Sequence, residues 1–197
     1  YSRSGECDWQ VHARGAVTRA EQMPMMDESL SQLRARCHRD IDIEAFYAGF
    51  VRAGLDFGPS FKSLEQVWHG RGEALGQLRP DRLDGSGFDL SPLLIDGALQ
   101  LIAAAVMADP DQPHARLFLP VGVDQVLLAA TDAESWWGHV VLREPLGDHK
   151  RALVCDVRLM TEDGRPAALL TGCRLLAVDQ AALTTLQTAA KRLRYDI

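Results

Sequence analysis

The stretch Ser91-Pro-Leu-Leu-Ile-Asp-Gly-Ala-Leu-Gln100 sets a single carboxylic acid among apolar residues and follows it with an amide four positions later. Ser91 is a typical N-cap residue and Pro92 is favoured at the first helical position, so we predict a helix from residue 93 to residue 107. Residues four apart lie on the same face of a helix. Asp96 and Gln100 are therefore expected to be neighbours.

The chemistry of Asp96 depends on what surrounds this helix. If the helix is enclosed, the carboxylate loses hydration, which raises its pKa and lets it hold a proton near neutral pH. A proton held in this way can be donated in catalysis. If the helix is not enclosed, Asp96 caps a neighbouring backbone segment or lies on the solvent-exposed edge of the helix. The stretch alone leaves both interpretations open.

Segments with strand character flank the helix on both sides in sequence, separated by turns rich in Asp, Gly and Pro. They cover residues 63–69, 73–78, 117–129, 135–143, 151–161 and 167–178. Because the helix is apolar over most of its circumference, it must be covered broadly. We therefore predict an α+β fold in which an antiparallel sheet wraps around one long central helix.

The remaining segments are shorter or less regular. Residues 9–17 have strand character, although nothing before them could form the rest of a sheet. A linker with a short helix near residues 27–36 is predicted next, then a helix over residues 43–53 that a glycine ends. Residues 181–195 are predicted to form a terminal helix or an interdomain linker.

The composition excludes several classes of function. A net charge of −6 in 197 residues provides no basic field for a phosphate backbone, so nucleic acid is not an expected partner. The most apolar window is shorter than a membrane span and contains Asp96 and Gln100, and no signal segment opens the chain. We expect a cytoplasmic protein that does not bind membranes.

The residues that commonly bind metals or phosphate are scattered. The four cysteines form no CxxC pair and the histidines lack metal-ligand spacing, so no metal site is predicted and the thiols are expected to be free. Two Gly-x-Gly pairs, at residues 70–72 and 85–87, lack the strand and helix that a nucleotide loop needs.

Four segments resemble the dehydratase domain of modular polyketide synthases. Gly54-Leu-Asp-Phe-Gly-Pro-Ser-Phe61 is similar to the family's glycine-tyrosine-glycine-proline-x-phenylalanine stretch, and Leu94-Ile-Asp-Gly-Ala-Leu-Gln100 resembles its catalytic aspartate segment. Phe118-Leu-Pro120 is similar to its leucine-proline strand start, and Trp9-x-x-His12-Ala-x-Gly15 resembles a closing strand. The order and spacing of these motifs agree with the family over almost the whole chain.

This resemblance implies a hot-dog fold and a division of the chain. Residues 1–22 would be the closing strand of a preceding hot-dog half, and residues 23–41 a linker. Residues 42–178 would form the C-terminal hot-dog domain, which is the second half of a double hot dog. Residues 179–197 would be a C-terminal linker or helix.

The resemblance also implies an activity, which is dehydration of a 3-hydroxyacyl thioester to a 2,3-enoyl thioester. An acid must protonate the departing oxygen while a base removes the α-proton. Asp96 would be the acid and Gln100 would orient it or the leaving hydroxyl. The expected substrate-binding residues are Phe57, Gly58, Pro59, Phe61, Leu119 and Pro120.

No cofactor is expected, because the substrate would be carried on the phosphopantetheine of an acyl carrier protein. That carrier protein, the N-terminal hot-dog half and neighbouring synthase domains are the expected partners. The resemblance leaves a homodimer open.

The sequence departs from the family pattern at several positions. Phe57 stands where the family has tyrosine, and Ser91 stands where many relatives have histidine. The family's basic histidine, in a His-x-x-x-Gly-x-x-x-x-Pro segment, has no counterpart, because the segment at His12 has the wrong spacing. We therefore expect this hydro-lyase to be incomplete as this chain alone, with its base in an upstream part of a larger polypeptide, on another chain, or lost.

The sequence is also consistent with two other functions. One is a related double hot-dog enzyme, either an enoyl-shifting isomerase or a product-template cyclase. Moving a double bond expels no water, so the presence of Asp96 weighs against the isomerase. The other is a non-catalytic hot-dog half that acts as a scaffold or binds acyl chains.

Overall fold

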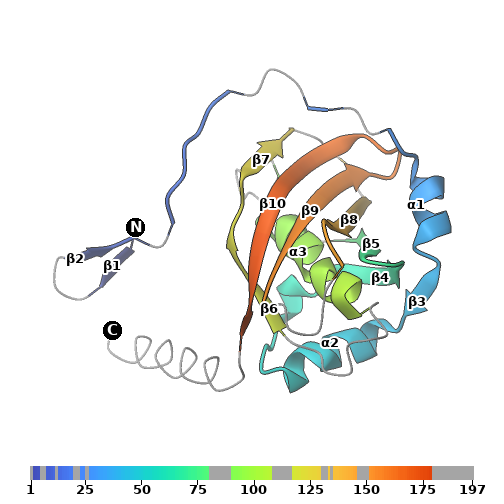
Figure 1. The fold of residues 1–197 in the computed structure, drawn as a ribbon, viewed down its shortest axis with the longest axis horizontal. Coiled ribbons are helices and arrows are strands. Elements are labelled where there is room, and N and C mark those ends of the chain that lie inside the picture. Colours follow the sequence, from blue (N-terminus) through green and yellow to red (C-terminus); the bar gives the residue numbers. More distant parts are fainter. Residues whose placement is uncertain are drawn as a thin grey trace.

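The computed structural model describes residues 2–4, 8–11, 13–19, 23–24, 27–79, 90–107, 117–129, 133, 135–145 and 151–178. Its main body is an eight-stranded antiparallel sheet in the order β3-β4-β5-β8-β9-β10-β6, with β7 also paired to β10. The strands are β3 Arg39–Ile41, β4 Leu64–His69, β5 Glu73–Leu78, β6 Leu117–Gly122, β7 Gln125–Leu128, β8 Trp136–Leu142, β9 Ala152–Thr161 and β10 Pro166–Val178. Figure 1 shows the sheet curving around one helix, α3 (Pro92–Met107). The predicted α+β arrangement is confirmed.

The start of α3 follows the predicted capping pattern. The backbone N–H of Leu93 donates to Ser91 Oγ at 3.3 Å, and the N–H of Leu94 donates to the Ser91 carbonyl at 3.0 Å. Ser91 thus satisfies N–H groups that the first helical turn leaves without partners. The helix begins where the serine and proline predict.

Two paired glycines of the sheet face the helix and let it approach closely. Gly76 of β5 pairs directly with Gly138 of β8. A Cβ added at Gly76 would come within 2.5 Å of Leu101 Cδ2, and one at Gly138 within 2.7 Å of Leu101 Cδ1. Leu101 is fully buried, so its side chain fills the space that the two missing side chains leave.

The opposite face of the sheet carries a second cluster. Helix α1 (Leu30–Arg36) covers it with Leu33, beside the stacked rings of Trp68 and Trp137. Leu75 belongs to this cluster, whereas its neighbours Ala74 and Gly76 face α3. Figure 1 shows α1 and α3 on opposite sides of β5 and β8. The short helix predicted in the linker therefore exists and is packed against the sheet.

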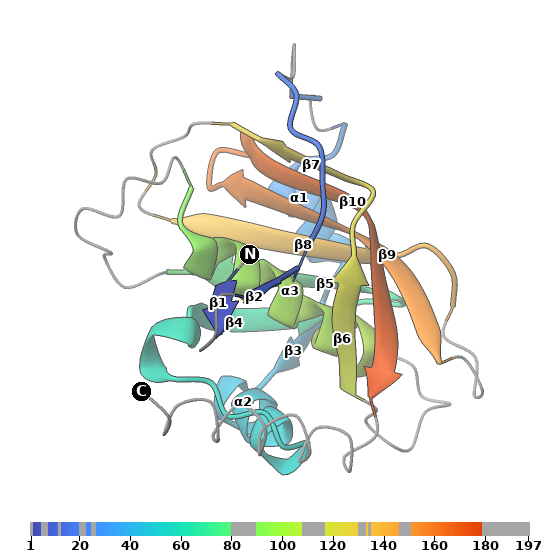
Figure 2. The same cartoon turned by 90° about the vertical axis from the view of Figure 1, so that its left-hand side faces the viewer.

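Helix α2 (Ile43–Arg52) and the 3-10 helix η1 (Pro59–Phe61) lie below α3 and precede β4, as Figure 2 shows from the side. Asp42 caps α2 by accepting a hydrogen bond from the Ala45 N–H at 2.7 Å. The predicted helix over residues 43–53 is confirmed. The described helices include none that is long and apolar enough to cross a membrane.

Two predicted strands differ from the structure. Residues 117–129 form two strands, because β10 pairs first with β7 and then, after an irregularity near Gly172, with β6. Among the described residues of 9–17, only Trp9 and Gln10 lie in a strand, β2 (Asp8–Gln10), which pairs with Ser2–Ser4 (β1) in a separate two-stranded sheet. The prediction for residues 181–195 lies outside the described residues.

The limits of the predicted domains remain a prediction, with one qualification. β3 falls within the predicted linker, residues 23–41, yet it pairs with β4 in the large sheet. The sheet therefore begins at Arg39.

The first testable prediction concerns two helical glycines with different surroundings. A Cβ at Gly97 of α3 would clash with Ser63 Oγ and lie 2.6 Å from Leu78 Cδ2, whereas one at Gly49 of α2 would meet only Arg52 Nη2 at 3.8 Å. Alanine is favoured over glycine in a helix by about 1 kcal/mol, but overpacking costs about 1–3 kcal/mol. We expect Gly97→Ala to lower the free energy of unfolding by up to about 2 kcal/mol and Gly49→Ala to raise it by up to about 1 kcal/mol. Urea unfolding of both variants measures this, and a stabilised Gly97→Ala variant would contradict the packing described.

Candidate active site

The segment that leads into β4 lies along the half of α3 that contains Asp96. At one end, Ser63 Oγ donates to the Leu93 carbonyl at 3.4 Å, and at the other, Gln100 bonds the Phe61 carbonyl. Gly97 lets the two segments approach, because any side chain there would meet Ser63. Asp96 lies between these contacts and is half-buried.

Gln100 holds Asp96 in place, as its spacing predicts. Its side chain is 5% exposed, and Nε2 donates to Asp96 Oδ2 at 2.8 Å and to the Phe61 carbonyl at 2.9 Å. A backbone carbonyl can only accept, so the Phe61 contact fixes the amide with its nitrogen toward Asp96. Oδ2 is then an acceptor, and a proton on this carboxyl group resides on Oδ1.

The surroundings of Asp96 favour its protonated form. Burial raises the pKa of Asp96 above its ordinary value, and the hydrogen bond from Gln100 offsets only part of this rise. The enclosed interpretation of Asp96 therefore agrees with the structure better than the solvent-exposed interpretation.

The turn before β4 contains the first group of predicted substrate-binding residues. Phe57 is half-buried and packs edge-to-face against Phe50, with ring centroids 5.1 Å apart. Gly58 and Pro59 are exposed at the start of η1, and the Phe61 side chain is 45% exposed. Through the Phe61 carbonyl, this turn is tied to Gln100. Substrate binding by these residues remains a prediction.

The second predicted group lies on another element. Leu119 and Pro120 are in β6, where they pair with Leu176 and Leu175 of β10. β6 is an edge strand of the sheet, which tolerates a proline because one side of the strand needs no N–H donor. Neither residue joins the hydrogen-bond network of Asp96 and Gln100 within the described part of the chain.

Sequence reasoning did not single out Tyr47, which the structure connects to the segment beside α3. It lies on α2, and its hydroxyl accepts a hydrogen bond from the Leu64 N–H at 3.3 Å. Burial raises the pKa of Tyr47 to about 12; the Leu64 N–H opposes the rise and the charge of Asp96 adds to it. In the sequence, Tyr47 stands in an apolar helical stripe, which predicts only a place in the core.

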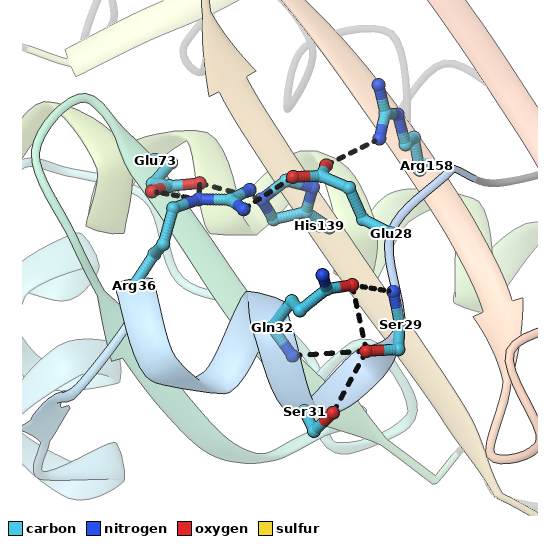
Figure 3. Close-up of polar contacts among 8 residues, drawn as sticks. All are labelled: Glu28, Ser29, Ser31, Gln32, Arg36, Glu73, His139 and Arg158. Carbon is cyan, nitrogen blue, oxygen red and sulfur yellow. Dashed lines mark hydrogen bonds and ion pairs between the residues drawn. The ribbon is translucent and has the colours of Figure 1, made fainter.

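The outer face of the sheet holds a different polar cluster, shown in Figure 3. Arg36 Nε donates to both Glu73 oxygens, at 3.0 and 3.2 Å, and Arg36 also pairs with Glu28. His139 is fully buried, and its Nε2 lies 3.1 Å from Glu73 Oε2. Glu28 also forms an ion pair with Arg158, so polar and charged side chains link α1, β5, β8 and β9.

Part of this cluster has the geometry of a metal site, which the sequence did not predict. Ligand atoms of Cys37, Glu73 and His139 lie within 4.8 Å of one another. However, the Arg36 guanidinium already neutralises Glu73, and burial raises the pKa of the Cys37 thiol to about 12. Metal ligands must be deprotonated, so these side chains fit an ion-pair network better than a metal centre.

The protonation of His139 agrees with a structural role. Burial lowers the pKa of His139, although the hydrogen bond to Glu73 opposes this shift. A neutral imidazole can donate from Nε2 to Glu73, which leaves Nδ1 as an acceptor without a partner among the described residues. His12, the other histidine considered in the sequence, lies outside the described residues.

Comparisons with known proteins agree with the fold and the motifs. Residues 26–185 match the family model described as polyketide synthase dehydratase N-terminal domain. Polyketide synthase GfsB of Streptomyces halstedii is 33% identical over 159 residues, which are 78% of this chain and 3% of that protein. Polyketide synthase PksM of Bacillus subtilis (strain 168) is 23% identical over 175 residues, which are 86% of this chain and 4% of that protein.

Solved dehydratase domains have the same fold. The domain from the CurK module of curacin polyketide synthase is 28% identical, with a TM-score of 0.67 over 82% of this chain and 55% of that chain. The domain from the CurJ module has a TM-score of 0.70 at 24% identity, over 82% of this chain and 57% of that chain. The chain thus spans little more than half of these dehydratase domains and a few per cent of the curated synthases it matches.

The second prediction follows from the raised pKa of Asp96. The folded chain holds this proton more tightly than the unfolded chain does, so ionising Asp96 costs stability as pH rises from the ordinary value of 3.8 through the folded value. The amide that Asp96→Asn introduces would accept from Gln100 without ever ionising. We expect the stability of Asp96→Asn relative to the native chain to increase across that pH window by at most about 1.4 kcal/mol per pH unit, and then to level off. Urea unfolding at a series of pH values measures it, and a relative stability that fell with rising pH would show that the pKa is lowered instead.

Proposed function

The chain belongs to the polyketide synthase dehydratase family, and on this basis we propose that it forms part of a dehydratase acting on a 3-hydroxyacyl thioester. The observation that carries the proposal is the half-buried Asp96, whose Oδ2 is held by Gln100 and whose Oδ1 is left for a proton. A carboxylic acid whose pKa is raised by burial, beside a fixed amide, can serve as the general acid of a dehydration.

In the proposed reaction, atoms and charges balance without a cofactor. A base takes the α-proton while the bond between C3 and its oxygen breaks, and the electron pair of the C–H bond forms the 2,3 double bond. Asp96 gives its proton to the departing oxygen, which leaves as water. The proton taken by the base can later return to Asp96 through solvent.

The base is proposed to be a histidine outside this chain. The sequence lacks the His-x-x-x-Gly-x-x-x-x-Pro segment that supplies it in the family. Solved inactive mutants of the CurK dehydratase replace one aspartate by asparagine or one histidine by phenylalanine. These mutants support an aspartate and a histidine as the working pair, of which this chain would supply the aspartate.

We propose further that the chain is the C-terminal hot-dog half of a longer synthase. The Asp96 segment supports this assignment, although the matching family model is described as an N-terminal domain. The expected partners are then the N-terminal half, neighbouring synthase domains and an acyl carrier protein that presents the substrate on phosphopantetheine. A cytoplasmic location belongs to the same proposal.

The third prediction tests Asp96 directly in the full synthase. Asp96→Asn keeps the side-chain volume and the contact to Gln100 but cannot donate the proton, so turnover of a 3-hydroxyacyl carrier substrate should fall at least about 100-fold. Asp40→Asn, which removes an exposed carboxylate on β3, is the matched control and should keep full turnover. Mass spectrometry of the acyl chain measures the lost water. Undiminished turnover by Asp96→Asn would remove Asp96 from the mechanism.

The fourth prediction separates the positioning role of Gln100 from simple packing. Gln100→Leu fills similar space but donates to neither Asp96 nor the Phe61 carbonyl, so we expect turnover to drop about 10- to 100-fold. Gln100→His retains an N–H donor and should lose much less. Equal losses in the two variants, measured in the same assay, would mean that the amide is only a packing residue.

A further inference from the structure

Tyr47 brings a phenol to the site from α2. Its side chain is 9% exposed and packs edge-to-face against Phe46 and Phe57, with ring centroids 5.7 and 6.4 Å apart. Its hydroxyl oxygen lies 3.3 Å from the Leu64 N–H, from which it accepts a hydrogen bond. The ring and the oxygen are therefore both held in place.

The contact with Leu64 connects this hydroxyl to the helix that carries Asp96. Leu64 directly follows the short segment Phe61–Ser63, and that segment bonds the Leu93 carbonyl and Gln100 of α3. The charge of Asp96 adds to the rise in the pKa of Tyr47. Tyr47 and Gln100 thus approach the region of Asp96 through the same short segment of backbone.

The hydroxyl proton of Tyr47 has no hydrogen-bond acceptor among the described residues. A phenol can accept hydrogen bonds and donate one. Leu64 occupies an acceptor position, and within the described residues no oxygen or nitrogen accepts the hydroxyl proton of Tyr47. A buried donor without an acceptor is uncommon in proteins, and a bound substrate could supply the acceptor here.

We propose that Tyr47 is a substrate-positioning residue, whose hydroxyl donates a hydrogen bond to the 3-hydroxyl oxygen of the acyl substrate beside Asp96. This inference rests on the proposed dehydratase function. The 3-hydroxyl oxygen has two lone pairs, so it can accept from Tyr47 and from protonated Asp96 together. Tyr47 keeps its proton throughout, because burial raises its pKa to about 12, and Asp96 alone transfers one.

Phe57, whose ring packs against Tyr47, offers no hydroxyl group of its own to a substrate. The position that the family resemblance assigns to a tyrosine is occupied here by Phe57, which has no hydroxyl. Phe57 packs against Tyr47 and against Phe50, so these three rings form one aromatic cluster. Among the three, Tyr47 is the ring that carries a hydroxyl group.

The experiment compares two ligands that differ by one oxygen. In the full synthase carrying Asp96→Asn, which prevents turnover, the affinities for 3-hydroxybutyryl-pantetheine and butyryl-pantetheine are measured by calorimetry with and without Tyr47→Phe. Losing one hydrogen bond should weaken binding of the hydroxylated ligand about 3- to 10-fold and leave the butyryl ligand within about 2-fold. Phe46→Leu, which alters the packing of the same ring, is the control and should affect both ligands alike.

Two outcomes would overturn the assignment. One is an equal weakening of both ligands by Tyr47→Phe in a variant whose urea unfolding shows that it is folded, and the other is no change for either ligand. Failure of the proposed function is a separate result, because it would appear as absence of dehydration by the unaltered synthase. A selective effect of Tyr47→Phe on the hydroxylated ligand would stand even then.

Discussion

The close approach of α3 to the sheet is the constraint on which the rest of the structure depends. Gly76 and Gly138 lie opposite each other in neighbouring strands, and Leu101 occupies the space that side chains there would take. A third glycine, Gly97, admits Ser63 to the flank of the helix. Once α3 is seated in this way, Asp96 and Gln100 are brought to the segment that leads into β4, and neither can turn away without moving the helix.

The site retains features that a purely structural helix would avoid. A half-buried carboxyl group in α3 costs free energy when it ionises, and Gln100 Oε1 is buried without a hydrogen-bond partner among the described residues. The hydroxyl proton of Tyr47 also has no acceptor among the described residues. A buried polar group without a partner calls for an explanation, and a bound substrate would supply partners for both groups at this site.

The sequence predicted the parts of the fold that depend on local pattern. The serine and proline before α3 marked its start, and i, i+4 spacing placed Gln100 against Asp96. Contacts between distant residues could not be predicted in this way: 66 residues separate Glu73 from His139, and 17 separate Tyr47 from Leu64. The break between β6 and β7 was also missed, because residues 117–129 are mostly apolar and only their pairing with β10 divides them into two strands.

The two faces of β5 and β8 show why register matters so much in this fold. On one face the paired glycines receive Leu101, and on the other Leu75 lies opposite His139, whose imidazole bonds Glu73 beneath α1. Alternate residues of a strand point to opposite faces, so a slip of one residue would exchange these two sets. The charged network would then be buried against α3, and the glycines would leave a gap under α1. The ion pairs on the outer face therefore help to specify the register that places Asp96, even though they take no part in its chemistry.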